Sequence, residues 1–410
     1  MKTQATLVAV LAAAMTLAGC SSSNGSTAAQ GTSGGPAPSA PVVQPAARGV
    51  EGAIGSIPWS QVGPGWMLAT WSPVVGNRPG VEPTPGEPTR ETATVTLYLV
   101  DPAGGRYPIT TFPPPGNRAG LELVDWSGDG SHALFYGEYD KPQTVIDVDL
   151  HTGTQTRVPI AEGVPRFARP DGTALLVTNH FGDYRMPAGL ERVDLAGKQQ
   201  FTYPTDKLDS KFNGPSLFTP DGTRLVLGTS AGLVVMGDDG AVVSTLSMPD
   251  RSPCTPVRWW DEQPGAIVVA QCVPDGDRAS RLWLVPLDGS APTPLTALKD
   301  GLTGPDYADL DAWKLPTGTY VQAMGACGVV FLAKVNADGT TSEVDVPNTE
   351  GSVGVLGANG GHLYLHTKAG CGGGQAIIDY DPAANTSTVL LGGPLNGGGV
   401  DDARLYGSQK

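Results

Sequence analysis

The sequence is poor in histidine and in basic residues, and both shortages exclude classes of function. Five of its 410 residues are His, and no Cys-x-x-Cys spacing accompanies its Cys, so we expect no metal and no cofactor. The 26 Lys and Arg are outnumbered by 40 Asp and Glu, which gives a net charge of −14. Because nucleic acids and anionic lipids are bound mainly through clustered Lys and Arg, we expect neither as an electrostatic partner.

Glycine and proline, in contrast, are abundant, with 56 Gly and 37 Pro. Both residues destabilise the interior of a helix and favour tight turns between short strands. The composition therefore indicates an all-β fold, and the length is sufficient for one long repeat domain.

The N-terminus carries the features of an export signal. Lys2 precedes an apolar run from Ala5 to Leu17, which is too short to span a bilayer stably. The run leads into Leu17-Ala18-Gly19-Cys20, which resembles the lipobox of bacterial lipoproteins. The resemblance implies a signal peptide over residues 1–19, lipid attachment at Cys20 and display outside the cytoplasmic membrane. A plain signal peptide followed by an unmodified Cys is the alternative.

The segment after Cys20 differs in composition from the rest of the chain. Residues 20–50 consist mostly of Ser, Gly, Ala and Pro, with few large apolar side chains. Such a segment cannot bury enough apolar surface to fold, so we interpret it as a flexible tether. The folded domain is expected over residues 51–410.

A turn-centred hairpin recurs along this domain. Phe218–Leu227 reads as a strand end, a Pro-Asp-Gly turn and the start of an antiparallel partner. Similar stretches occur at Ala168–Val177 and Trp126–Phe135. A hairpin repeated at intervals of tens of residues is typical of a β-propeller.

Two independent series of turns predict the number of blades. We expect the inner hairpin of each blade to turn at Trp59–Gly63, Trp126–Gly130, Ala168–Gly172, Phe218–Gly222, Trp260–Gly265, Trp313–Gly318 and Leu356–Gly360. We expect the outer hairpins to turn at Asp101–Gly104, Thr152–Gly153, Ala196–Gly197, Asp238–Gly240, Asp288–Gly289, Asn336–Gly339 and Asp381–Ala383. Both series give seven four-stranded blades, with six or eight as alternatives. The tail, Arg404-Leu405-Tyr406, is expected to add a strand to either the first or the last blade.

The Pro-Asp-Gly-Thr motifs at Pro170–Thr173 and Pro220–Thr223 resemble the repeats of TolB-like propellers and, more loosely, of WD-repeat proteins. The resemblance extends over about Ile54–Leu391, and it implies a propeller fold and an association with envelope binding proteins. Two departures limit it. TolB has a six-bladed propeller, and no partner-binding motif of that family matches this chain residue by residue.

Four Cys remain in the folded domain, and an even number in an exported protein suggests two disulfides. Three pairings are possible for Cys254, Cys272, Cys327 and Cys371. Cys254 and Cys272 flank one inner hairpin symmetrically, whereas Cys327 and Cys371 occupy equivalent loops of successive blades. We therefore favour the pairs 254–272 and 327–371.

Ligands of propellers usually bind at the face formed by the loops between blades and between the two hairpins of a blade. The longest of these loops are Pro73–Glu91, Gly137–Gln143, Asn179–Gly189, Thr205–Gly214, Met248–Cys254 and Ala297–Asp309. The candidate binding residues on this face are His180, Phe181, Asp183, Tyr184, Arg185 and Arg251, because they combine aromatic side chains with both charges. The alternative interpretation is an ordinary solvated loop.

Three patterns that imitate catalytic or metal sites carry little weight. Gly228–Gly232 matches G-x-S-x-G, but it connects two strands and no helix follows. His362 and His366 are predicted to lie on a strand, too far apart to share one metal ion. Asp306, Asp309 and Asp311 could bind Ca²⁺, but they lack the spacing of an EF-hand, and we expect solvated turns.

The sequence as a whole predicts a monomeric, lipid-anchored propeller that binds an envelope protein, a peptide or a glycan through its loop face. A propeller enzyme of the lyase, glycosidase or quinone-dependent dehydrogenase type, with an axial active site, is the alternative. Two observations argue against it: His is scarce, and we find no repeated set of Arg, His or Asp on the inner strands. A structural lipoprotein that assists assembly of a larger complex is a third class.

Overall fold

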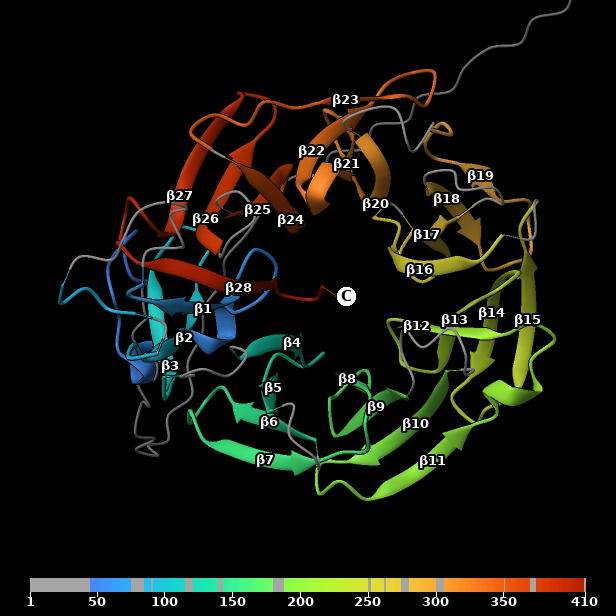
Figure 1. Ribbon diagram of the computed structural model, residues 1–410, viewed down its shortest axis with the longest axis horizontal. Helices are drawn as coiled ribbons and strands as arrows, with labels where there is room; N and C mark the ends of the chain where they lie inside the picture. The colour runs from blue at the N-terminus through green and yellow to red at the C-terminus, as the bar shows by residue number, and fades with distance from the viewer. Residues whose placement is uncertain are drawn as a thin grey trace, which may run out of the picture. The chain divides into compact units, whose positions relative to one another are not determined.

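Seven four-stranded antiparallel sheets make up the part of the chain that the structure describes, and they surround a common axis (Figure 1). The structure is a computed structural model, and it describes residues 45–74, 85–89, 91–114, 121–138, 143–179, 188–249, 252–261, 263–273, 280–299, 306–349, 351–368 and 374–408. All of these residues belong to one compact unit, Val43–Lys410. The chain is a seven-bladed β-propeller, as the two series of turns predict.

Six of the blades each use four consecutive strands, which follow one another from the axis outward. The second blade contains β4 (Glu122–Trp126), β5 (His132–Glu138), β6 (Thr144–Asp149) and β7 (Gln155–Pro159), and the third contains β8 (Val164–Phe167), β9 (Ala174–Asn179), β10 (Gly189–Asp194) and β11 (Gln199–Tyr203). The fourth contains β12 (Phe212–Phe218), β13 (Arg224–Thr229), β14 (Gly232–Gly237) and β15 (Val242–Ser247), and the fifth contains β16 (Cys254–Trp259), β17 (Ile267–Cys272), β18 (Arg281–Pro286) and β19 (Thr293–Pro294). The sixth contains β20 (Asp306–Leu315), β21 (Gly318–Gly325), β22 (Val330–Val335) and β23 (Thr341–Glu343), and the seventh contains β24 (Ser352–Asn359), β25 (His362–Lys368), β26 (Gly374–Asp381) and β27 (Thr386–Gly392).

The first blade joins the two ends of the domain. Its inner strand is the last strand of the chain, β28 (Gly399–Leu405), which pairs antiparallel with β1 (Met67–Ser72). The other two strands are β2 (Val95–Val100) and β3 (Arg106–Phe112). The tail therefore adds its strand to the first blade, and this pairing closes the ring.

The prediction of an inner hairpin at Trp59–Gly63 was wrong. Trp59 lies in a 3-10 turn, η2 (Trp59–Gln61), that precedes β1, and its indole stacks on the ring of His151 at 4.0 Å between centroids. In the first blade, the inner strand is β28. It pairs with β1, although the two strands lie far apart in the sequence. The other six inner turns lie between the first two strands of their blades, as predicted.

In the second, third and fourth blades, the inner turn is held by an Asp that accepts hydrogen bonds from its neighbours. In the fourth blade, Asp221 accepts the Thr219 hydroxyl at 2.6 Å and the Thr223 amide at 3.1 Å. These bonds lower the pKa of Asp221 to about 2. Gly222 follows with φ +69°, a left-handed conformation that favours Gly. The Pro-Asp-Gly-Thr motif is therefore explained by the geometry of the turn alone.

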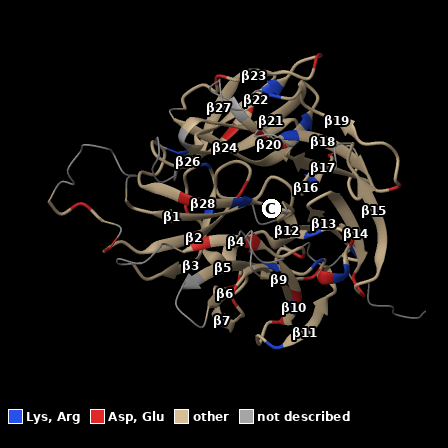
Figure 2. Cartoon of the chain, turned by 45° about the vertical axis from the view of Figure 1, so that its right-hand side comes forward, with Lys and Arg blue, Asp and Glu red and all other residues tan. Residues whose placement is uncertain are grey.

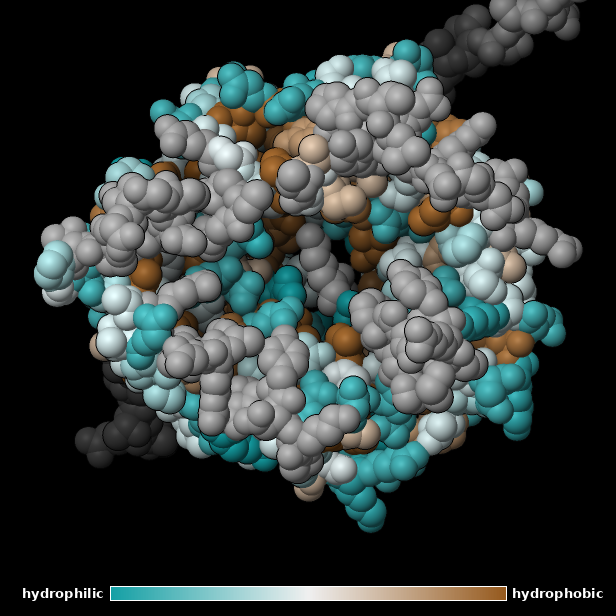
Figure 3. Space-filling view, in the orientation of Figure 1, coloured by the Kyte–Doolittle hydropathy of each residue, from teal (hydrophilic) through white to brown (hydrophobic). Residues whose placement is uncertain are grey.

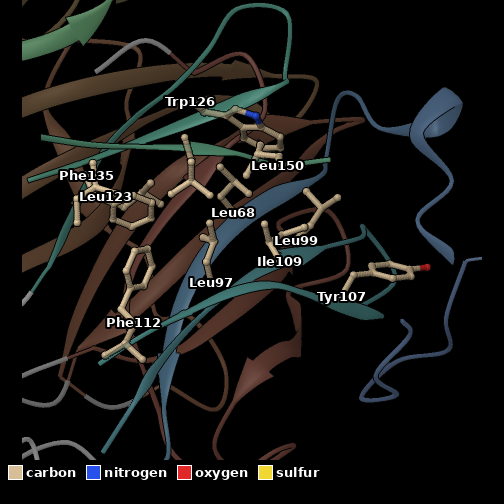
Figure 4. Packing of buried hydrophobic residues seen from close by; sticks show 14 of the residues in the cluster. Leu68, Leu97, Leu99, Tyr107, Ile109, Phe112, Leu123, Trp126, Phe135 and Leu150 are labelled. Carbon is tan, nitrogen blue, oxygen red and sulfur yellow. The ribbon is translucent and has the colours of Figure 1, made fainter. Parts of the chain in front are cut away.

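Apolar side chains fill the space between neighbouring blades. Figure 4 shows this between the first and second blades, where Leu68, Leu97 and Leu99 face Leu123 and Phe135. These five side chains are fully buried. Each contributes roughly 1.5–3 kcal/mol relative to an exposed position, so the contacts between blades stabilise the ring.

Tyr406, directly after β28, adds a second contact to the ring closure. Its backbone N–H donates to the Trp66 carbonyl at 2.8 Å, and its ring packs edge-on against Trp126 of the second blade at 5.1 Å. The segment that directly follows β28 runs toward the middle of the ring (Figure 1). The C-terminal segment therefore contacts both the first blade and the second blade.

Candidate functional site

Seven hydrogen bonds made by polar side chains connect each blade of the propeller to the next one around the axis. The seven hydrogen bonds are Arg404 Nε to Val124 O (3.3 Å), Phe167 N to Asp125 Oδ2 (2.9 Å), Arg166 Nη1 to Ser216 O (3.3 Å), Asn213 Nδ2 to Cys254 O (3.4 Å), Arg258 Nη1 to Ala312 O (3.2 Å), Val355 N to Gln322 Oε1 (2.6 Å) and His366 Nε2 to Val400 O (2.9 Å). They use backbone groups that the free edges of the inner strands would otherwise leave unpaired. The ring is therefore interlocked at its axis as well as packed between its blades.

Three Arg occupy the same place in alternate blades. Arg404, Arg166 and Arg258 are each the penultimate residue of an inner strand, β28, β8 and β16. Each donates to a carbonyl of the following blade. The expectation that no repeated charged set lines the inner strands was wrong. The signal in the sequence is Arg followed by a large apolar residue at the strand end, as in Arg166-Phe167, Arg258-Trp259 and Arg404-Leu405.

Arg258 lines a cavity of about 350 Å³ on the side of the fifth to seventh blades. Its guanidinium bonds Asp261 at 3.0 Å and lies 5.0 Å from the centre of the Trp313 ring. Asp261 also accepts the Lys314 N–H at 2.9 Å. The charge of Arg258 is therefore balanced by Asp261 and shielded by an aromatic face.

This cavity lies at the end of the propeller where the hairpins turn. Pro220 and Pro264, which belong to inner turns, form part of its wall, and so does the C-terminal segment Leu405–Ser408. Figure 3 shows a hollow near the middle of the ring on the face turned to the viewer, but not the cavity itself. The size suits a small polar ligand. The cavity was not predicted from the sequence, because its wall combines turns of several blades with the end of the chain.

On the opposite side of the axis, a buried carboxylate and two Arg side chains lie close together. Asp125 bonds Arg169 at 2.9 Å, and the two side chains are 4% and 7% exposed. Burial lowers the pKa of the nearby Arg166; the Asp125 carboxylate opposes this effect, whereas Arg404 and Arg169 add to it. A small cavity of about 10 Å³ lies between Asp125, Arg166 and Arg169.

The predicted binding loop is not among the residues that the structure describes. His180, Phe181, Asp183, Tyr184, Arg185 and Arg251 lie outside the described residues, and so do Cys20 and Cys371. Cys327 lies in the 3-10 turn η4 (Ala326–Gly328). The binding role of the loop, the lipid anchor and the 327–371 pair therefore stay predictions.

The structure contains the predicted disulfide between Cys254 and Cys272. The two residues face each other across β16 and β17, with Cα atoms 4.2 Å apart. Two facing Cys this close can be bridged without moving the backbone. The bond joins the two strands of the inner hairpin of the fifth blade, which also carries Arg258.

The acidic cluster of the sixth blade is not a group of solvated turns, and that expectation was wrong. Asp309 and Asp311 lie on β20, where a bulge interrupts the pairing with β21, and both are buried. Asp309 bonds the Lys299 ammonium at 2.6 Å. Within the described ranges, no three His, Cys, Asp or Glu side chains come together as a metal site would require.

The other patterns that imitate catalytic sites have structural roles. Ser230 lies in the turn between β13 and β14, and its hydroxyl accepts the Lys211 N–H at 3.1 Å. His362 and His366 lie on β25, as the alternation predicts. His362 pairs with Asp379 at 2.8 Å, and His366 is one of the links to the closing strand.

The arrangement defines a seven-bladed β-propeller with a polar, interlocked axis. Its structural neighbours include TolB from Acinetobacter baumannii (14% identity, 83% of this chain and 66% of that chain, TM-score 0.42). They also include the β-propeller domain of Cps50 (Swd1) from Myceliophteria thermophila (14% identity, 68% and 88%, TM-score 0.46) and the dihydro-heme d1 dehydrogenase NirN (16% identity, 83% and 80%, TM-score 0.47). The chain thus spans slightly less than two thirds of the TolB structure.

These similarities concern the fold. No family model matches the sequence, and no curated protein matches it. In the part of the chain that the structure describes, no helix has the length and apolar character needed to cross a bilayer.

Proposed function

We propose that this protein is a lipid-anchored binding propeller that presents its loop face to an envelope protein, a peptide or a glycan. The lipid on Cys20 holds it at the membrane, and residues 20–50 act as the tether. The protein acts as a monomer outside the cytoplasm and needs no cofactor.

One observation supports binding over catalysis. The ionisable side chains at the axis bond the backbone of neighbouring blades, as Asp125, Arg258 and His366 do. A group engaged in this way holds the ring rigid and is poorly placed to exchange protons with a substrate. Rigid scaffolds that display loops of variable sequence are typical of binding proteins.

The proposal is tested by crosslinking and affinity capture from intact cells that produce the tethered protein. The variant carries Phe181→Ala, Tyr184→Ala and Arg185→Ala. The matched control carries Asp206→Ala, Lys207→Ala and Asp209→Ala, three exposed side chains of another loop on the same face.

We expect one partner to be captured by the wild type and the control and lost in the variant. Capture that is equal in all three would contradict a role for the 180–185 loop. The absence of any partner would direct attention to a small ligand in the cavity beside Arg258.

The lipid anchor has its own test. Labelling with radioactive palmitate is expected for the wild type and is expected to disappear with Cys20→Ala. Label that remains on the Cys20→Ala protein would exclude the lipobox interpretation.

A further inference from the structure

Positive charge gathers in the axial wall formed by the first four blades. Two guanidinium groups line one small cavity there, Arg166 from β8 and Arg169 from the inner turn of the third blade, and the charge of Arg404 on β28 also acts on Arg166. Figure 2 shows a basic segment at the end of β28 next to the middle of the ring. The carboxylate of Asp125 lies among them and bonds Arg169.

The carboxylates do not balance this charge. Asp125 is the one carboxylate among the residues that line the small cavity. The two guanidinium groups on the same cavity, those of Arg166 and Arg169, therefore exceed it by one charge. This excess is local, since the whole chain carries a net charge of −14.

Arg169 contributes a buried donor that the described residues leave unused. Its side chain is 7% exposed, and its Nη2 bonds Asp125. Its Nη1 is buried and has no hydrogen-bond partner among the residues that the structure describes. Buried polar groups are almost always hydrogen-bonded, and a buried donor that is left unused costs free energy. The donor therefore points to an acceptor that the protein itself does not provide.

The space beside this donor is small. The cavity between Asp125, Arg166 and Arg169 has a volume of about 10 Å³, close to the minimum for one water molecule. A carboxylate or a phosphate is too large for it. A monatomic anion such as chloride is much smaller than either, and it can both accept the Nη1–H and neutralise the excess charge.

We propose that a halide ion, chloride in ordinary salt solutions, binds between Arg166 and Arg169 and links the second, third and fourth blades. A water molecule at the same place would satisfy the donor but not the charge. Because the ion binds only the folded ring, the stability of the protein rises with the chloride concentration.

Thermal unfolding of the full chain at constant ionic strength tests this inference. Chloride replaces gluconate, an organic anion too large for the cavity, from about 5 mM to about 500 mM. We expect the melting temperature of the wild type to rise by about 2–4 °C. In Arg169→Met, which removes the unpaired donor, the melting temperature should be the same in both salts.

Arg258→Met is the control, because Arg258 holds the strand position of Arg166 in another blade and is paired with Asp261. This variant should keep the chloride dependence of the wild type, even if its melting temperature is lower. Equal melting temperatures of the wild type in the two salts would overturn the inference. So would a chloride dependence that survives in Arg169→Met.

A crystal of the wild type grown with sodium bromide supplies a readout that needs no variant. We expect an anomalous peak within contact distance of both the Arg166 and the Arg169 guanidinium. Density for a water molecule there, without an anomalous signal, would overturn the inference.

Discussion

Arg258 and Arg166 occupy equivalent places in the fifth and third blades, yet their surroundings differ. Arg258 bonds Asp261 and covers Trp313, next to the larger axial cavity. Arg166 makes the same kind of bond to the next blade, but Arg169 and Arg404 lie near it. Both Arg therefore link their blade to the next one. The charge of Arg258 is balanced by Asp261, whereas positive charge is in excess around Arg166.

The comparison indicates where the repeat carries specific chemistry. The bond from each Arg to the following blade is part of the ring itself. The groups around each Arg come from turns and from the chain end, which are free to vary between blades. We therefore expect specific binding sites on a propeller where a residue that recurs in several blades has neighbours that differ from blade to blade.

The largest expected effect concerns the two carboxylates that face these Arg. Asp125→Ala leaves buried guanidinium groups without their closest carboxylate, which should lower the free energy of unfolding by about 3–5 kcal/mol. Asp261→Ala should cost about 1 kcal/mol, because that carboxylate is 30% exposed and water can replace it. Urea denaturation of both variants in gluconate measures the difference, and equal losses would contradict the electrostatic contrast.

The next effect concerns the covalent restraint present beside Arg258. The disulfide Cys254–Cys272 closes a segment with a sequence separation of 18 residues. Its removal by Cys254→Ala and Cys272→Ala should lower the free energy of unfolding by about 3 kcal/mol. Guanidinium denaturation gives the value. A variant as stable as the wild type would show that this side of the ring does not depend on the bond.

A smaller effect is expected where the turns of the third and fourth blades meet. A Cβ on Gly222 would lie 2.4 Å from the Arg169 carbonyl, and Gly222 has φ +69°. Gly289→Ala is the control, since Gly289 has φ +85° but nothing within 4 Å of an added Cβ. Backbone strain should cost each variant about 1 kcal/mol, and the clash should add about 1 kcal/mol in Gly222→Ala alone. Equal melting temperatures of the two variants would mean that the turns of the third and fourth blades can move apart without loss of stability.

The smallest effect depends on pH and on the link between the seventh blade and the closing strand. Burial lowers the pKa of the His366 imidazole; the bond to the Val400 carbonyl opposes this effect, and Lys368 adds to it. The imidazole is therefore neutral in the folded chain, whereas the unfolded chain takes up a proton below about pH 6.5.

Stability is thus complete above about pH 6.5 and decreases as the pH falls, by at most about 1.4 kcal/mol per unit from this residue. His366→Gln keeps a donor for Val400 but does not titrate, so its stability should change less between pH 7.5 and pH 5.5. Denaturation curves at these two pH values measure the change. Identical slopes for the wild type and His366→Gln would exclude this role.

The turns of the propeller could be predicted from the sequence because their chemistry is local. Asp221 and Gly222 show their roles through immediate neighbours, and six inner and seven outer hairpins follow from such signals. The ring closure could not be predicted in this way. The partner of β1 is β28, more than 300 residues later, and nothing near Trp59 indicates that the inner strand is missing there.

The axial charges were missed for a related reason. In the sequence, Arg166 and Arg258 look like ordinary polar positions of alternating strands. Their role depends on a carbonyl of the following blade, Ser216 or Ala312, about 50 residues later in the chain. Asp309 and Asp311 were likewise predicted to be turn residues, although both are buried on β20. Their burial depends on the bulge in this strand, which the sequence does not indicate.

We propose that this propeller binds its partner through the loop face and not through the face where its hairpins turn. The most direct test places a photo-crosslinking amino acid at Tyr184, in the predicted binding loop, or at Ser290, an exposed residue of an outer hairpin turn. Irradiation of intact cells should give one crosslinked partner from position 184 and none from position 290. The same partner captured from position 290, with none from position 184, would contradict the account.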